Sequence, residues 1–403
     1  MSVATLRLSH CDVKDVMNLP GSPVSKLPDV GTTIFTVMSA LATEQKALNL
    51  SQGFPDFDGP EALLERVNAH MRNGQNQYPP MAGVAVLRQA IAAKVDDLYG
   101  LHCDPETEVT VTAGATEALF CAIAAVVHPG DEVIVLDPAY DSYDPVIRLQ
   151  GGVAVHVPLI APSYRIDWER IEAAITSRTR LLILNSPHNP TGMVMQDADI
   201  VALSALCARH DIYLIGDEVY EHMVFDQGEH LSLCAYADLY TRSFVISSFG
   251  KTYHVTGWKV GYCVAPPQLT QEFRRVHQYV TFTVNTPVQL GIADFLQEHP
   301  EHHEQLPEFY QAKRDTFCEL LQGSRFHIEP SQGTYFQLLG YADVSAARDV
   351  ELARRWTCEQ GIASIPISVF YQNPSDCEHR ALRFCFAKDD DTLAQAAEIL
   401  CRL

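Results

Sequence analysis

The segment SSFGKTYHVTGWKVGY (residues 247–262) places two lysines, Lys251 and Lys259, after an apolar run, SFVISSF (243–249), that is typical of a buried strand. A lysine at the end of a buried strand can supply a reactive amine, because its pKa falls where the surroundings exclude water. The run predicts a strand of a buried sheet, and the two lysines follow the point where that strand ends.

Similar runs rich in Val, Ile and Leu occur upstream: EVTVT (108–112), DEVIVLD (131–137), RLLILNSP (180–187) and IYLIGDE (212–218). Longer stretches at 117–127, 168–176 and 197–210 predict helices between them. This alternation predicts an α/β fold with a mainly parallel sheet that is covered on both faces. Catalytic and binding residues of such folds gather at the carboxyl ends of the strands.

The composition narrows the class of protein. A chain of 403 residues is long enough for one large or two medium domains, and its net charge of −21 argues against binding to nucleic acid or anionic membranes. The 11 cysteines contain no Cys-x-x-Cys pair, which argues against a zinc ribbon and favours a reducing compartment. Since the N-terminal stretch MSVATLRLSHCDVKDV lacks the apolar core of a signal peptide and no apolar run could span a bilayer, we expect a cytoplasmic protein.

The strand ends carry motifs that each allow two interpretations. VTAGATEALF (111–120) could form a turn whose free helix amides bind a phosphate, or an ordinary turn with Thr116 as helix N-cap. In DPAYDSYDP (137–145), Tyr140 could stack on a planar ring or pack on the core. In NSPHNPTG (185–192), Asn189 could donate to a phenolic oxygen or simply belong to a turn.

GDEVY (216–220) adds an acid at the end of a fourth strand. Asp217 could keep a pyridine nitrogen protonated or cap a helix, and Tyr220 could hydrogen-bond a ring hydroxyl. Together with Lys251, the five strand ends offer a phosphate cradle, a stacking aromatic ring, partners for a ring oxygen, an acid and an amine. Those are the groups that pyridoxal phosphate requires.

NSPHNPTG, DEVY and SSFGKTYHVTGWKVGY resemble the signatures of the class I aminotransferases of fold-type I, from about residue 18 to the C-terminus. LSQGFPDF (50–57), GQNQYPPMAG (74–83) and LRFCFAKDD (382–390) are similar to the methionine and kynurenine aminotransferase branch. The resemblance implies a large cofactor-binding domain, 51–294, around a mainly parallel seven-stranded sheet. Residues 1–50 and an α+β module, 295–403, would form a small domain, with strands at 334–340 and 381–387 after a polar connection, EHPEHHEQLPEF (298–309).

The resemblance also implies the roles of individual residues. The first lysine, Lys251, would bond the cofactor, and the second, Lys259, would pair with its phosphate. The other implied cofactor contacts are Ala115, Thr116 and Ser248 at the phosphate, Tyr140 on the ring face, Asn189 and Tyr220 at the ring oxygen, and Asp217 at the ring nitrogen.

The substrate and the partner subunit complete the implied site. Arg383 would grip the α-carboxylate of the substrate as a bidentate fork, with the backbone amide of Gly53 nearby. Tyr78 would cross a dimer interface to the phosphate in the neighbouring subunit, so we expect a homodimer with shared active sites.

The expected reaction is ping-pong transamination between an amino acid and a 2-oxo acid. TTIFTVMSALA (32–42) places Ile34, Phe35 and Met38 on one helix face, and QYVTFTV (278–284) adds Phe282, which we expect from the partner chain. These residues predict an apolar pocket for methionine and large uncharged or aromatic amino acids, although Met38 is better explained as core.

Three alternatives remain open from the sequence. The same residues would support a kynurenine aminotransferase or β-elimination at cysteine S-conjugates. A pyridoxal-phosphate-binding regulator is disfavoured, because the aminotransferase pattern leaves no room upstream for a DNA-binding domain. HPEHHE (299–304) could bind a metal, but its charged surroundings favour an exposed helix face, so we predict no metal.

Overall fold

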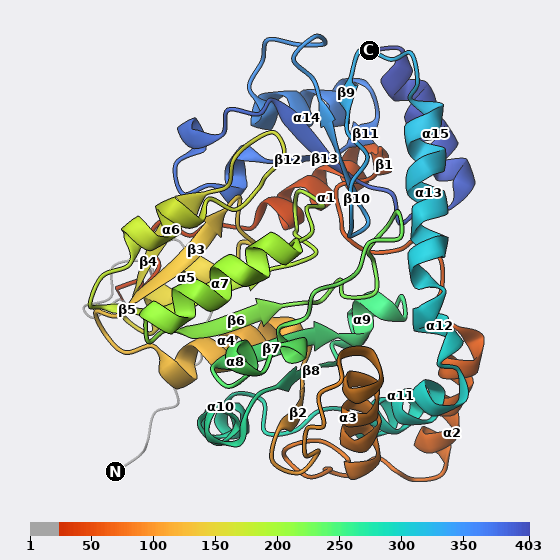
Figure 1. Ribbon diagram of the computed structural model, residues 1–403. Coiled ribbons are helices and arrows are strands. Elements are labelled where there is room, and N and C mark those ends of the chain that lie inside the picture. Colours follow the sequence, from red (N-terminus) through yellow and green to blue (C-terminus); the bar gives the residue numbers. More distant parts are fainter. Residues whose placement is uncertain (1–23) are drawn as a thin grey trace, which may run out of the picture.

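The computed structural model describes residues 24–403, so the earlier part of the predicted N-terminal segment lies outside the described residues. A seven-stranded sheet forms the centre, in the order β2–β8–β7–β6–β5–β3–β4 (Figure 1). Its strands are β2 (Val109–Thr112), β3 (Glu132–Asp137), β4 (Val153–Pro158), β5 (Thr179–Asn185), β6 (Tyr213–Asp217), β7 (Ser243–Ser248) and β8 (Gly261–Val264). Only β8 runs opposite to the other six strands, so the predicted mainly parallel sheet is confirmed.

The five strands predicted from apolar runs correspond to β2, β3, β5, β6 and β7, while β4 and β8 were not predicted. Strand β4 lies at the edge of the sheet and is only partly buried, which explains its weaker apolar signal. Strand β8 has four residues and returns antiparallel directly after the lysine segment.

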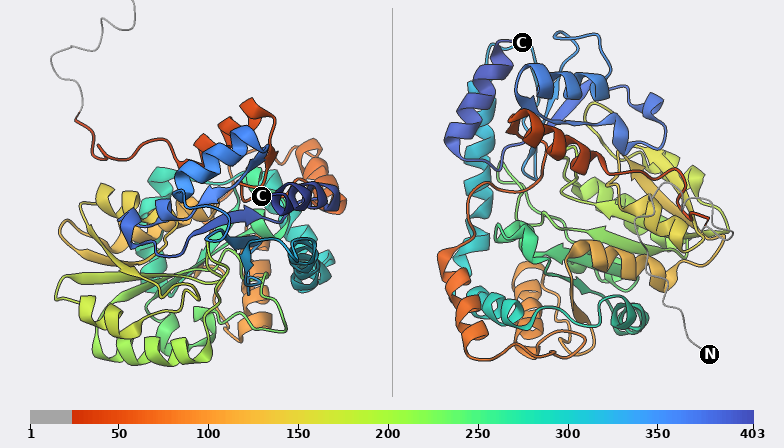
Figure 2. Two further views of the ribbon diagram at one scale, coloured as in Figure 1. Left: turned by 90° about the horizontal axis from the view of Figure 1, so that it is seen from above. Right: turned by 180° about the vertical axis from the view of Figure 1, so that it is seen from behind.

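Helices cover both faces of the sheet, as the two further views in Figure 2 show. The helices in this part of the chain are α2 (Glu61–Arg72), α3 (Ala85–Tyr99), α4 (Ala115–Val126), α5 (Tyr143–Leu149), α6 (Trp168–Ala174), α7 (Asp197–Arg209), α8 (Ala237–Tyr240), α9 (Phe249–Thr252), α10 (Pro267–Val280) and α11 (Thr286–Glu298). Short 3₁₀ turns are η2 (Leu233–Ala235), η3 (Thr256–Trp258), η4 (Ser368–Phe370) and η5 (Pro374–Asp376). The predicted helices at 117–127, 168–176 and 197–210 correspond to α4, α6 and α7.

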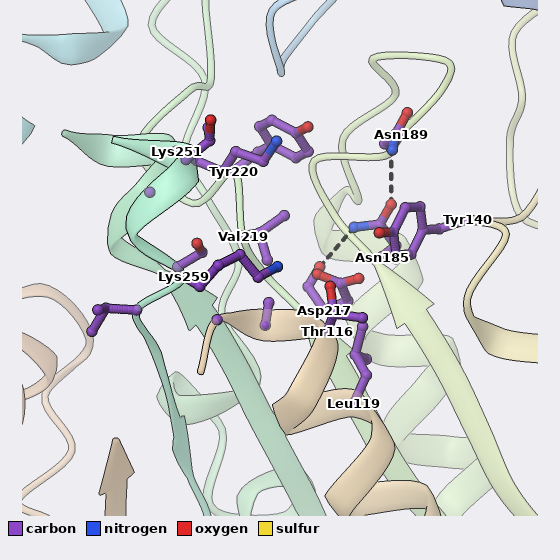
Figure 3. Close-up of a pocket in the computed structure, with 16 residues that line it drawn as sticks. Thr116, Leu119, Tyr140, Asn185, Asn189, Asp217, Val219, Tyr220, Lys251 and Lys259 are labelled. Carbon is purple, nitrogen blue, oxygen red and sulfur yellow. Dashed lines mark hydrogen bonds between the residues drawn. The ribbon is translucent and has the colours of Figure 1, made fainter. Parts of the chain in front are cut away.

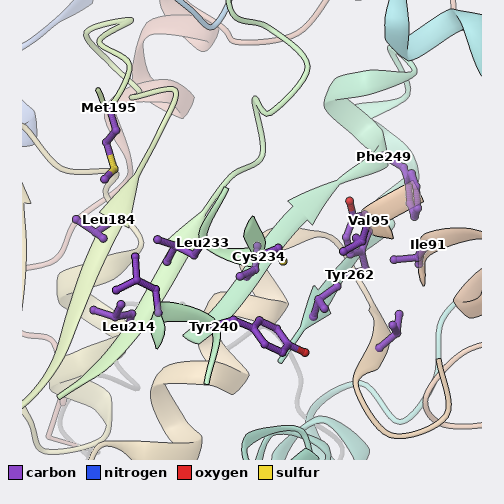
Figure 4. Close-up of a cluster of buried hydrophobic side chains, with 14 of the residues drawn as sticks. Ile91, Val95, Leu184, Met195, Leu214, Leu233, Cys234, Tyr240, Phe249 and Tyr262 are labelled. Atoms are coloured by element: carbon purple, nitrogen blue, oxygen red, sulfur yellow. The ribbon is translucent and has the colours of Figure 1, made fainter. Parts of the chain in front are cut away.

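Alternation along the buried strands divides the core between the two faces. Leu182 and Leu184 of β5 belong to one hydrophobic cluster with Leu203 of α7. Figure 4 shows part of this cluster, including Leu184. Leu181 and Ile183 of the same strand join a second cluster that includes residues of α4 and α5. Burial on both faces accounts for the nearly continuous apolar runs in the sequence.

A C-terminal module holds a four-stranded sheet in the order β12–β13–β10–β9. Its elements are α13 (Leu306–Leu320), β9 (His327–Ile328), β10 (Phe336–Gly340), α14 (Asp349–Glu359), β11 (Ile362–Ala363), β12 (Ile365–Pro366), β13 (Ala381–Cys385) and α15 (Asp390–Cys401). The strands predicted at 334–340 and 381–387 are β10 and β13, which pair antiparallel.

The start of the described chain joins this module. Helix α1 (Ile34–Gln45) lies among the C-terminal elements in Figure 1, and β1 (Leu48–Asn49) pairs with β11. Met38 and Leu50 belong to the same hydrophobic cluster as Phe317 and Leu382. Met38 is therefore a core residue, in agreement with the sequence interpretation.

The predicted polar connection at 298–309 is partly helical, since helix α12 (Glu301–Glu304) and the start of α13 lie within it. Its histidines are also less exposed than expected. The ring of His303 is buried and lies 4.9 Å from that of His222, and His302 Nε2 lies 3.0 Å from the carbonyl oxygen of Thr252. Among residues 24–403, no helix is long and apolar enough to cross a membrane.

Candidate active site

A cavity of about 170 Å³ lies at the carboxyl ends of β5, β6 and β7, beside the first turn of α4 (Figure 3). Nine of the residues predicted from the sequence line it: Ala115, Thr116, Tyr140, Asn189, Asp217, Tyr220, Ser248, Lys251 and Lys259. The parallel strands bring these residues together because their carboxyl ends meet at one edge of the sheet.

One end of the cavity has the chemistry of an anion site. Gly114 adopts a φ of 77°, and the helix α4 begins at the next residue, so the first helix amides are available. A Cβ atom on Gly114 would lie 3.3 Å from Nζ of Lys259, which places this ammonium group against the turn. Ser248 lines the same cavity. Helix amides, an ammonium group and a hydroxyl are suitable partners for a phosphate.

The carboxylate of Glu117, in the first turn of α4, holds the preceding turn in place. It accepts hydrogen bonds from the Ala113 amide at 3.0 Å and from the Cys121 thiol at 2.8 Å. The ring of His277 in α10 contacts the same carboxylate at 2.8 Å. With these contacts, Glu117 ties the turn to two helices and holds the amides of the anion site in place.

The acid Asp217 ends β6 with one of its two carboxylate oxygens lacking a partner. Oδ2 accepts a hydrogen bond of 2.5 Å from the hydroxyl of Tyr143, whereas Oδ1 is buried without a hydrogen-bond partner among the described residues. Burial raises the pKa of Asp217 to about 6. A protonated ring nitrogen at Oδ1 would supply the missing donor and positive charge. No helix follows Asp217, so the alternative of a helix cap is excluded.

Two asparagines connect the acid with the substrate side of the cavity (Figure 3). The Nδ2 atom of Asn185 donates to the carbonyl oxygen of Asp217 at 2.8 Å, and its Oδ1 accepts from the amide of Asn189 at 2.8 Å. Oδ1 of Asn189 then accepts from Arg383 at 2.6 Å. These contacts use the backbone N–H and the side-chain oxygen of Asn189. Its side-chain nitrogen, Nδ2, is then the donor for a ring oxygen of the ligand.

Two tyrosines, Tyr220 and Tyr140, also line the cavity where the aromatic ring of a cofactor would lie. Tyr220 is buried, and burial raises its pKa, so its hydroxyl stays protonated. Tyr140 lines the cavity from the loop after β3, and burial raises its pKa to about 12. Both hydroxyls therefore remain neutral hydrogen-bonding groups at physiological pH.

The amine of Lys251 lies among groups of the N-terminal segment and the C-terminal module. Nζ donates to the carbonyl oxygen of Gly53 at 3.0 Å and to the hydroxyl of Tyr335 at 2.9 Å. Burial lowers the pKa of Lys251 to about 8, with help from the charges of Arg383 and Lys259. This lysine is therefore poised to lose its proton.

Arg383 on β13 is a buried cation with an unused donor. Its guanidinium group lies 3.8 Å from the centre of the Phe336 ring and 5.2 Å from that of Phe35. One terminal nitrogen donates to Asn189 and the other to the carbonyl oxygen of Ser51, while Nε has no partner among the described residues. Burial lowers the pKa of Arg383 to about 10. A bound carboxylate would restore both charge balance and hydrogen bonding.

Tyr78 and Phe282 do not reach this cavity within the chain. Their rings pack edge to face at 5.4 Å on the surface, with 83% of Tyr78 and 48% of Phe282 exposed. Nearby in sequence, Tyr279 is 86% exposed. The structure thus places a protruding aromatic pair at the position for which the sequence predicts a subunit contact.

Three residues of the site were not predicted. Asn185 and Tyr143 stand in the quoted motifs NSPHNPTG and DPAYDSYDP, but only their contacts with Asp217 reveal their roles. Tyr335 stands in the predicted strand 334–340, where nothing in the sequence marks it as a neighbour of Lys251.

The groups gathered in the cavity are those that pyridoxal phosphate would engage. Its phosphate matches the anion site of Gly114 and Lys259, its ring nitrogen matches Oδ1 of Asp217, and its aldehyde matches the amine of Lys251. The residues present therefore fit this cofactor.

Comparison with known proteins agrees with a pyridoxal-phosphate site. Residues 45–400 match the family model described as aminotransferase class I and II. The methionine aminotransferase of Escherichia coli is 54% identical over 386 residues, covering 96% of this chain and all of that protein. The crystal structure of Escherichia coli YbdL, with an identified methionine aminotransferase function, superposes with a TM-score of 0.93 and 54% identity, covering 95% of this chain and all of that one.

A more distant relative is kynurenine–oxoglutarate transaminase 1 of Rattus norvegicus, 33% identical over 408 residues, covering 93% of this chain and 96% of that protein. The family match and the full-length similarity show both the fold and the type of reaction. The substrates are an amino acid and a 2-oxo acid. The chain belongs to the class I and II aminotransferases and is a pyridoxal-phosphate-dependent transaminase.

Proposed function

We propose that this enzyme transfers the amino group of methionine, and of other large uncharged or aromatic amino acids, to a 2-oxo acid. The supporting observation is the environment of Arg383, whose unpartnered Nε lies among the rings of Phe35, Phe336 and Phe370. Such a site offers an anchor for an α-carboxylate and apolar surface for a side chain. The full-length similarity to a methionine aminotransferase supports the same donor.

The residues of the site have separate roles in the proposed transamination. When bound, pyridoxal phosphate supplies a protonated ring that accepts the electron pair left at the substrate Cα. Asp217 keeps the proton on the ring nitrogen, and Arg383 orients the substrate through its carboxylate. Lys251 would first hold the cofactor and then, once freed, would move the α-proton of the substrate to the cofactor carbon. Lys259 would pair with the phosphate.

The kynurenine transaminases among the relatives keep kynurenine aminotransfer, and with it β-elimination from cysteine S-conjugates, as a second candidate activity. Their identity of 32–33% is well below the 54% of the methionine aminotransferase, so we place methionine first. A regulator without catalysis finds no support, because the chain carries the complete transaminase constellation.

The donor preference is the first prediction. Among the described residues that line the cavity, the only cations are Lys251 and Lys259, so no basic group is free for a second carboxylate. We expect kcat/KM for aspartate to be about 100-fold or more below that for methionine, since an unpaired carboxylate would be desolvated. For phenylalanine, tyrosine and kynurenine, the activation free energy that corresponds to kcat/KM should differ from that for methionine by only about 1–3 kcal/mol.

A matrix of amino donors against 2-oxo acids measures this preference. Ammonia release from a cysteine S-conjugate without a 2-oxo acid measures β-elimination in the same preparation. Aspartate equal to methionine in kcat/KM would contradict the apolar pocket.

We also propose two domains, residues 51–294 and residues 1–50 with 295–403. The support is that Met38 and Leu50 share a hydrophobic cluster made mainly of residues 306–400, which only Tyr220, Met223 and Phe225 join from among the buried members in residues 51–294. The cytoplasmic location stays a prediction from the sequence.

The enzyme is further proposed to act as a homodimer with shared active sites. The exposed pair Tyr78 and Phe282 supports this, because large aromatic side chains are costly to leave in water and frequent in interfaces. In the dimer, Tyr78 would reach the phosphate site of the partner and Phe282 its substrate pocket.

Mixing two inactive variants tests the shared site. Lys251→Ala and Tyr78→Ala chains, refolded together, form mixed dimers in which one site carries both defects and the other carries neither. We expect up to about a quarter of wild-type activity, because random pairing makes half of the dimers mixed and each has one intact site. Each variant refolded alone is the control. If verified mixed dimers stay inactive, Tyr78 serves its own subunit.

A further inference from the structure

The amine of Lys251 is held in a closed triangle of hydrogen bonds. Nζ lies 3.0 Å from the carbonyl oxygen of Gly53 and 2.9 Å from the hydroxyl oxygen of Tyr335. The Tyr335 hydroxyl in turn donates to the carbonyl oxygen of Gly53 at 2.5 Å. The three groups come from segments that are 84 to 282 residues apart in the sequence.

The direction of each hydrogen bond follows from the chemistry of the groups. A carbonyl oxygen only accepts, so the hydrogen of the Tyr335 hydroxyl is used on Gly53. The hydroxyl oxygen therefore turns a lone pair to Nζ, and both oxygens accept from the amine. These two are the only hydrogen-bond partners of Nζ among residues 24–403.

Two acceptors match the neutral form of the amine. A neutral amine has two N–H groups and one lone pair, whereas an ammonium group has three N–H groups and would turn the third toward the cavity that Lys251 lines. With both N–H directions fixed, the tetrahedral nitrogen has one direction left for its lone pair. Burial also lowers the pKa of Lys251 to about 8, which favours the same form.

We propose that Tyr335 is a positioning residue whose hydroxyl, together with the Gly53 carbonyl, directs the lone pair of the freed Lys251 amine at the α-proton of the substrate. This inference rests on the proposed role of Lys251. In that step the lone pair of Nζ takes the proton as the Cα–H bond breaks. The electron pair of the bond would pass to the protonated cofactor ring, and Lys251 would then give the proton to the cofactor carbon that carries the nitrogen.

The surroundings of Tyr335 suit this role. The side chain is fully buried, and its ring packs 5.2 Å from that of Tyr220 and 5.0 Å from that of Phe336. A Cβ atom on Gly53 would lie 2.7 Å from the Phe336 ring, so only glycine lets this backbone approach so closely. Burial raises the pKa of Tyr335 well above 10. Its hydroxyl thus keeps its proton and acts as an orienting group rather than as a base.

The test replaces Tyr335 by Phe, with Tyr310→Phe as the matched control. Tyr310 is also fully buried, its ring lies 5.6 Å from that of Tyr335, and its hydroxyl contacts His254 at 3.0 Å instead of Lys251. Loss of one orienting hydrogen bond should lower kcat of Tyr335→Phe about 10-fold with KM within about 2-fold. Tyr310→Phe should keep wild-type kcat.

Two further readouts separate positioning from a general structural role. With the α-deuterated form of the best amino donor, the isotope effect on kcat should be at least as large in Tyr335→Phe as in the wild type, because proton removal has become slower. In crystals of the apoenzyme, Nζ of Lys251 should be ordered against Gly53 in the wild type and displaced or disordered in Tyr335→Phe.

Contrary results are equally distinct. Wild-type kcat in Tyr335→Phe, an equal loss in both variants, or a smaller isotope effect would overturn the role of Tyr335. An active Lys251→Ala variant would instead overturn the proposed role of the lysine itself. An inactive Lys251→Ala variant beside a wild-type-like Tyr335→Phe leaves the lysine role intact and removes only this inference.

Discussion

Lys251→Ala is expected to abolish transamination, with a loss in kcat of about 10⁴-fold or more, because the variant lacks both the cofactor-bonding amine and the base for the α-proton. The purified variant should also lack the visible absorbance of the lysine-bound cofactor. Both effects follow from the position of Nζ, which is buried at the strand ends with its pKa lowered to about 8.

Lys259→Ala is the matched control, since it removes the other lysine of the same cavity. It should retain the visible absorbance but bind the cofactor about 10-fold to 100-fold more weakly, through the loss of a charge-assisted hydrogen bond to the phosphate. Titration of each apoenzyme with pyridoxal phosphate measures both quantities. Absorbance lost in Lys259→Ala and kept in Lys251→Ala would mean that the two roles are exchanged.

Asp217→Asn is expected to raise the activation free energy by about 3 kcal/mol, which lowers kcat on the order of 10²-fold or more. The substitution keeps the size of the side chain but removes the negative charge that would hold the proton on the ring nitrogen. The effect should be large because Oδ1 is buried and, within the described chain, has no other partner to share that charge.

Tyr143→Phe gives the control for Asp217. It removes the hydrogen bond of 2.5 Å to Oδ2 while the carboxylate stays in place, so kcat should fall by no more than about 10-fold. Single-turnover rates with saturating donor compare the two variants without interference from product release. Near-wild-type turnover in Asp217→Asn would show that the charge at this position has no part in the reaction.

Much of the fold could be predicted because local patterns were strong. Five of the seven strands of the central sheet are apolar runs, since both faces of a mainly parallel sheet are buried. The same logic placed Lys251, Asp217 and Asn189 at one edge, because each follows a strand of that sheet. The edge strand β4 was missed because partial burial weakens its apolar pattern, and β8 was missed because it begins inside the segment that carries the two lysines.

Other features were decided by tertiary structure alone. The family resemblance marks Gly53 for its backbone amide near the substrate carboxylate, but only the packing of distant segments shows that its carbonyl oxygen accepts a hydrogen bond from Lys251. Tyr335 carries no signal in its own neighbourhood, since its hydroxyl meets the amine across 84 residues of chain.

The physical reason lies in the range of the interactions. Burial and backbone propensity act between near neighbours, so they leave a periodic record in the sequence. A hydrogen bond between segments 282 residues apart, such as that of Tyr335 with Gly53, is specified by the packing of whole elements and leaves no such record. Local patterns therefore specify the sheet and the residues at its edge, whereas the packing of distant segments specifies which of their atoms meet.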